Sequence, residues 1–74
     1  MMNIILYTID DCYRCKMVKK MLDEHHVEYQ CINDKELMIK NQFQEAPTIV
    51  VNGEVFDNFT SVLAWLEKNN LYSL

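Results

Sequence analysis

The chain has 74 residues, half of them apolar or aromatic, and this composition predicts one folded domain over residues 1–74. Its net charge of −4, with seven Lys and Arg residues diluted by eleven acids, argues against a nucleic-acid partner. Apolar runs are far shorter than the roughly 20 residues that cross a bilayer, and residues 1–9 lack the features of a secretory signal. We therefore expect a cytoplasmic protein with no membrane partner, acting as a monomer.

The first half of the chain predicts a strand, a helix and a second strand. Residues 3–8 form a short apolar run closed by Asp10 and Asp11, which is typical of a buried strand. Residues 13–26 then have helical spacing, with an apolar stripe of Cys15, Val18, Met21 and Leu22. Residues 28–33 alternate in polarity, which indicates a half-buried strand. Two strands joined by a helix should be parallel, with a right-handed crossover.

The second half predicts a short helix, a hairpin and a final helix. Asn33, with Glu36 three residues later, fits a capping box that begins the short helix. Residues 48–51 are a β-branched strand, Asn52-Gly53 is a strong hairpin signal, and residues 54–56 return antiparallel. The last helix has its cap among Asn58, Thr60 and Ser61. The order βαβαββα predicts an α/β fold with a four-stranded mixed sheet and three helices.

The pair Cys12 and Cys15 carries the chemistry that we predict. Three cysteines do not make a disulfide framework, and Cys-x-x-Cys between a strand and a helix indicates a redox motif. At the start of a helix, free amide groups and the helix dipole favour a thiolate, which is the nucleophile. We expect Cys12 to be accessible with a lowered pKa, partly offset by Asp10 and Asp11. Cys15, on the apolar stripe, should be buried and resolve mixed disulfides.

Other candidate residues have simpler interpretations. We expect Cys31 to be buried and inert, because free cysteines usually are. A zinc site that combines it with Cys12, Cys15 and His25 or His26 is rejected, because the histidines end the helix that Cys12 begins. Tyr13 should be exposed and pack on a partner. Pro47 should start its strand, and from the residues alone a trans peptide bond is the default.

The thiol pair, the single proline before a β-branched strand, the Asn-Gly hairpin and the final amphipathic helix occur here in one order. With these features the whole chain resembles the glutaredoxin family. The resemblance implies a thioredoxin-like fold, a cis peptide bond before Pro47, and Cys12 and Cys15 as attacking and resolving thiols. It also implies that the redox group is the Cys12–Cys15 disulfide itself, with no cofactor.

Two departures point to a subgroup. Typical glutaredoxins have a lysine where this chain has Asp10, and a Gly-Gly step where it has residues 57–61 without glycine. Both departures disfavour glutathione. The segments 6–16 and 45–48 look more like the glutaredoxin-like redoxins that supply electrons to ribonucleotide reductase and are recharged by thioredoxin reductase. We expect the protein disulfide substrate to meet these residues: Tyr13, Arg14, Ala46, Pro47, Thr48, Asn58, Phe59 and Thr60.

Three alternatives stay open at this point. The first is a glutaredoxin recharged by glutathione. The second is a metal module, either a copper carrier or an iron–sulfur holder, although a copper carrier needs an order that ends in a strand. The third is a binding module in which the cysteines are incidental.

Overall fold

The computed structural model describes residues 2–73 and begins with the predicted strand–helix–strand unit. Strand β1 spans Ile4–Thr8, helix α1 spans Tyr13–Glu24 and strand β2 spans Gln30–Asn33. β1 and β2 are parallel, as predicted. Helix α1 ends two residues earlier than its apolar spacing suggested, because His26 adopts a left-handed conformation with φ 56°. β2 likewise begins two residues later than predicted.

Helix α2, Lys35–Lys40, is capped by a different residue from the one predicted. Asn33 is the last residue of β2, and its side-chain amide donates to Thr8 Oγ1 at 3.2 Å. Asp34 is the cap instead, with its carboxylate accepting from the Leu37 amide at 3.0 Å. The capping-box prediction was wrong by one residue, because pairing with β1 extends the strand through Asn33.

The hairpin and the last helix follow the prediction. Strands β3, Thr48–Val51, and β4, Glu54–Phe56, are antiparallel, and the turn residues Asn52 and Gly53 have φ 50° and 85°. Helix α3 spans Phe59–Lys68 and its cap is Asn58, one of the three candidates.

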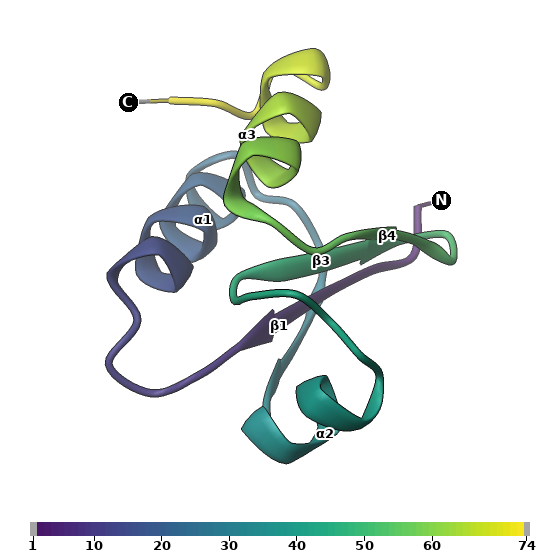
Figure 1. Cartoon of the computed structure of the whole chain (residues 1–74). Coiled ribbons are helices and arrows are strands. Elements are labelled where there is room, and N and C mark those ends of the chain that lie inside the picture. The colour runs from purple at the N-terminus through teal and green to yellow at the C-terminus, as the bar shows by residue number, and fades with distance from the viewer. Residues whose placement is uncertain (1, 74) are drawn as a thin grey trace.

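The four strands form one mixed sheet in the order β2-β1-β3-β4, which confirms the predicted fold class. Helices α1 and α3 cover one face of the sheet, while α2 lies on the other (Figure 1). The core lies between the central strands and helices α1 and α3, and its fully buried members are Leu6, Val18, Met21, Leu22, Ile49, Val62 and Leu66. This packing fixes the start of α1 beside the end of β1, where the thiol pair lies. Within residues 2–73, no helix has the length and apolar character needed to span a membrane.

Candidate active site

The turn between β1 and α1 presents a cysteine as the cap of the helix. Asp11 has φ 55°, and Cys12 follows in an extended conformation, so the chain reverses before the helix begins at Tyr13. The backbone amide of Cys15 donates to the Cys12 sulfur at 3.1 Å. Sulfur therefore occupies the place that a Ser, Asn or Asp oxygen takes at most helix starts. The helix has no acidic residue in its first turn.

Cys12 and Cys15 are joined in a disulfide, with Cα atoms 5.2 Å apart. Cys15 is 3% exposed and packs in the interior, whereas Cys12 is only half-buried. An incoming thiolate therefore reaches the Cys12 sulfur more readily than the Cys15 sulfur. In the reduced protein, the same difference in exposure makes Cys12 the more accessible nucleophile, and the division of roles between the two thiols stays a prediction.

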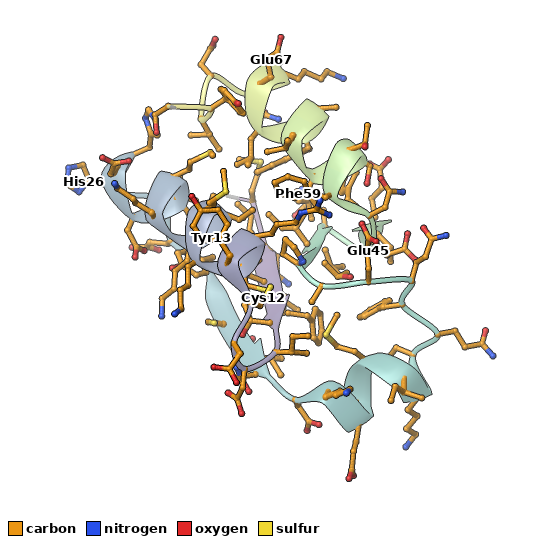
Figure 2. All side chains as sticks on the ribbon, turned by 60° about the vertical axis from the view of Figure 1, so that its left-hand side comes forward. Cys12, Tyr13, His26, Glu45, Phe59 and Glu67 are labelled. Carbon is orange, nitrogen blue, oxygen red and sulfur yellow. A yellow bond between two sulfur atoms is a disulfide. The ribbon has the colours of Figure 1, made fainter. Side chains whose placement is uncertain are left out.

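Tyr13 and Arg14, inside the motif, both point away from the core. Tyr13 is 76% exposed, as predicted. The guanidinium carbon of Arg14 lies 4.6 Å from the centre of the Phe59 ring, a cation–π contact between α1 and α3. In Figure 2, Phe59 lies between Tyr13 and Glu45, on the same side of the molecule as Cys12.

The segment before β3 lies at the same edge of the sheet. Thr48 pairs with Tyr7, so Pro47 falls beside the end of β1, where the motif begins. The Ala46–Pro47 peptide bond is cis, as the resemblance implied. Thr48 is fully buried, and its hydroxyl donates to the Glu45 carbonyl at 2.7 Å. The Thr48 side chain therefore holds this segment in place.

The start of α3 forms the third part of the site. The Asn58 side chain accepts from the Ser61 amide at 2.8 Å, and the Ser61 hydroxyl donates to the Asn58 carbonyl. Thr60 is exposed in the first turn. The structure thus brings the motif, the segment before β3 and the start of α3 to one edge.

Sequence reasoning missed two carboxylates at this edge. Glu45 Oε1 accepts from the Phe59 amide at 2.8 Å, and Asp57 Oδ2 accepts from the Gln44 amide at 3.0 Å. The Glu45 amide also donates to the Asp57 carbonyl at 3.1 Å. These bonds join residues 12 to 14 positions apart, a pairing that no local pattern encodes.

Cys31 differs from the prediction, because it is exposed. It lies on β2, one of the two edge strands, and lines a pocket beside the disulfide together with Cys15, Lys16 and Lys19. Its sulfur is 3.9 Å from Thr8 Oγ1. The alternation pattern assigned it to a covered face, but an edge strand leaves that position open. Among residues 2–73, no three His, Cys, Asp or Glu side chains are placed to hold a metal ion.

A thioredoxin-like sheet that carries a Cys-x-x-Cys disulfide at the start of its first helix defines a class, the thiol–disulfide oxidoreductases. The family model for glutaredoxin matches residues 4–56, and the chain belongs to the glutaredoxin family. The glutaredoxin-like protein NrdH of Lactococcus lactis subsp. cremoris is 34% identical over 62 residues, which cover 76% of this chain and 86% of that protein. NrdH of Lactococcus lactis subsp. lactis matches equally well.

Solved structures agree on the fold. The thioredoxin-like protein BC3987 is 27% identical with a TM-score of 0.71, and the match covers 95% of this chain and all of that one. Glutaredoxin 1 from Francisella tularensis, solved with cacodylate, has a TM-score of 0.72 at 21% identity, over 97% of this chain and 100% of that chain. At that identity the second match supports the fold alone. This protein is therefore a thiol–disulfide oxidoreductase of the glutaredoxin family.

Proposed function

We propose that this protein is a cytoplasmic dithiol electron donor that reduces protein disulfides, with ribonucleotide reductase as its favoured client and thioredoxin reductase as its source of electrons. The observation that carries the proposal is the half-buried Cys12 sulfur, which accepts a hydrogen bond from the first-turn amide of a buried Cys15. The likeness to the NrdH proteins supports the choice of subgroup.

The reaction runs in two steps. The Cys12 thiolate attacks one sulfur of the client disulfide, forming a mixed disulfide and releasing the other client sulfur as a thiolate that takes up a proton. The Cys15 thiol loses its proton, and its sulfur attacks Cys12. The second client sulfur leaves, and the protein keeps the Cys12–Cys15 disulfide. Two electrons pass to the client, and the redox group belongs to the chain itself, so the proposal includes no cofactor.

The substrate would lie along the edge where the three parts of the site meet. We assign the main chain of Ala46–Pro47 and of Thr48 to pairing with an extended client segment, because they lie beside the end of β1. Tyr13 and Arg14 would contact the client on one side, and Asn58, Phe59 and Thr60 on the other. We propose that the protein acts as a monomer with one domain, residues 1–74, which supplies all of these groups.

A recharging assay tests the proposal. We expect thioredoxin reductase with NADPH to reduce the oxidised protein in repeated turnovers, and glutathione with glutathione reductase to do so slowly. Fast turnover with glutathione alone would replace the proposal with a glutathione-dependent glutaredoxin. A Cys15→Ser variant should accumulate mixed disulfides with its clients, which mass spectrometry would identify. Absence of ribonucleotide reductase from that set would leave general disulfide reduction as the function.

A further inference from the structure

Glu45 places a carboxylate on the first turn of α3 from outside that helix. It directly precedes the Ala46–Pro47 pair, and its Oε1 accepts from the Phe59 amide at 2.8 Å. Free amides at a helix start attract anions, through direct hydrogen bonds and through the helix dipole. At α3 the Glu45 carboxylate of the protein itself takes the place of such an anion.

A second first-turn donor of α3 is occupied in the same way. The Ser61 amide donates to Asn58 Oδ1 at 2.8 Å. Asp57 lies on the chain just before this cap and holds the amide of Gln44, so two carboxylates stand close to the start of the helix. A negatively charged ligand would meet two occupied donors, the amides of Phe59 and Ser61, and two carboxylates here.

This corner is linked to the thiol pair by one further contact. The Phe59 ring lies under the guanidinium of Arg14, which stands between Cys12 and Cys15 in the sequence. Figure 2 places Glu45, Phe59 and Cys12 on the same side of the molecule. This corner and the pair Asp10 and Asp11 therefore border the face on which a ligand bonded to the Cys12 sulfur would lie.

We propose that Glu45 is a specificity-determining residue that disfavours anionic thiols, such as glutathione, as reductants of the Cys12–Cys15 disulfide. The inference deepens the proposed function, on which it rests, by naming a side chain that selects against one reductant. Its carboxylate occupies the Phe59 amide and adds a negative charge beside the path of the ligand. Neutral or basic segments around a client cysteine meet no such opposition.

Glu45 would oppose a two-step reduction of the disulfide by glutathione. A glutathione thiolate attacks the Cys12 sulfur, the disulfide opens, and Cys15 leaves as a thiolate that takes up a proton. A second glutathione thiolate attacks the glutathione sulfur of the mixed disulfide and releases Cys12 as a thiolate. The two glutathione molecules supply two electrons and end as one glutathione disulfide.

The test compares rates of reduction of the oxidised protein by glutathione and by the neutral thiol 2-mercaptoethanol, with free thiols counted by mass spectrometry after an acid quench. The ratio of the two rates removes any general change in reactivity. We expect this ratio to rise about twofold in Glu45→Gln, which loses only the charge, and about fivefold in Glu45→Ala, which also frees the amide. Glu67→Gln, at the far end of the same helix, removes the same charge and should leave the ratio unchanged.

An unchanged ratio in both Glu45 variants would overturn the inference, and so would an equal rise in Glu67→Gln. Glu45→Gln retains an oxygen that can accept from Phe59, so one variant stays informative if Glu45→Ala folds poorly. These outcomes are separate from the fate of the proposed function, which depends on whether thioredoxin reductase recharges the unmodified protein.

Discussion

The first turns of α1 and α3 lie over the same face of the sheet, and in each a side chain just before the helix accepts a hydrogen bond from the amide three residues on. At α1 the acceptor is the Cys12 sulfur, 3.1 Å from the Cys15 amide. At α3 it is an Asn58 oxygen, 2.8 Å from the Ser61 amide. The backbone arrangement is the same at both helix starts. The capping atom makes the difference, because a sulfur can react with a disulfide and an amide oxygen cannot.

Charge separates the two helix starts further. Neither first turn contains an acidic residue, and at α1 the amides are available to the negative charge that develops on a reduced Cys12, although Asp10 and Asp11 precede it. The first amide of α3 already bonds the Glu45 carboxylate. One helix start therefore favours a reactive thiolate, while the other is neutralised by the protein and serves stability and selection.

The largest effect should come from exchanging the capping atom of α1. Cys12→Ser should reduce insulin disulfides no faster than buffer with dithiothreitol alone, because the sulfur nucleophile is gone. Its free energy of unfolding should stay within about 0.5 kcal/mol of the reduced parent, since serine is itself a good cap. Insulin turbidity and urea unfolding under reducing conditions measure the two quantities.

The matched control is Cys31→Ser, which removes the exposed thiol of β2 and should retain turnover. Turnover by Cys12→Ser at the parent rate would show that the cysteines are incidental. Loss of turnover in Cys31→Ser as well would show that the third thiol takes part in the reaction.

The next effect concerns selectivity among the three thiols. In the reduced protein at pH 7, iodoacetamide should modify Cys12 at least about tenfold faster than Cys15, because Cys15 is buried and Cys12 lies at the start of α1, where a first-turn amide donates to its sulfur. Cys31 should also react more slowly than Cys12, although it is exposed, because a strand offers it no helix amides. Peptide mapping after timed quenching gives the three rates, and equal rates would refute the special role of the helix start.

The sequence was sufficient to predict those features that depend on local patterns. Local patterns of spacing and residue type predicted three features: the position of Cys12 at a helix start, the hairpin at Asn52-Gly53 and the strand over residues 48–51. The structure confirms all three. The order of the elements then restricts the topology to a few arrangements, so the mixed sheet was predictable as well.

The features that the sequence analysis got wrong or missed depend on contacts between segments far apart in the sequence. Asn33 fits a capping box locally, but β1 keeps it in the sheet and Asp34 takes its place. Cys31 alternates correctly, yet its strand lies at the edge, and strand position in the sheet decides its exposure. Glu45 reaches Phe59 only after the fold brings the two segments together. The position of the thiol pair was therefore predictable from the sequence, whereas the contact between Glu45 and Phe59 was not.

A smaller effect tests the α3 cap. Asn58→Ala should lower the free energy of unfolding by about 1 kcal/mol, because the Ser61 amide loses its acceptor. Asn58→Asp should recover most of the loss, since a carboxylate caps equally well. Thr60→Ala, two residues on and exposed, is the control and should change stability by less than about 0.5 kcal/mol. Urea unfolding measures all three, and an equal loss in Thr60→Ala would contradict the assignment of the cap.

The smallest effect concerns the far half of α1, where Asp23 accepts a hydrogen bond from the Tyr29 hydroxyl at 2.7 Å. Burial, this hydrogen bond and the negative charge of Asp23 together raise the pKa of Tyr29 well above its usual value near 10. Above pH 10 the unfolded chain releases this proton while the native protein keeps it, so stability should fall as the pH rises. Tyr29→Phe should be slightly less stable than the parent at pH 7, because the hydrogen bond is lost. Between pH 9 and 11, however, its free energy of unfolding should fall less than that of the parent. Urea unfolding at a series of pH values compares the two slopes, and parallel curves would show that Tyr29 titrates normally. A steeper slope for the parent would show that Tyr29 is held in its neutral form beside one end of α1. The first turn at the other end of α1 instead favours the anion of Cys12, so the local partners of one helix favour opposite charge states at its two ends.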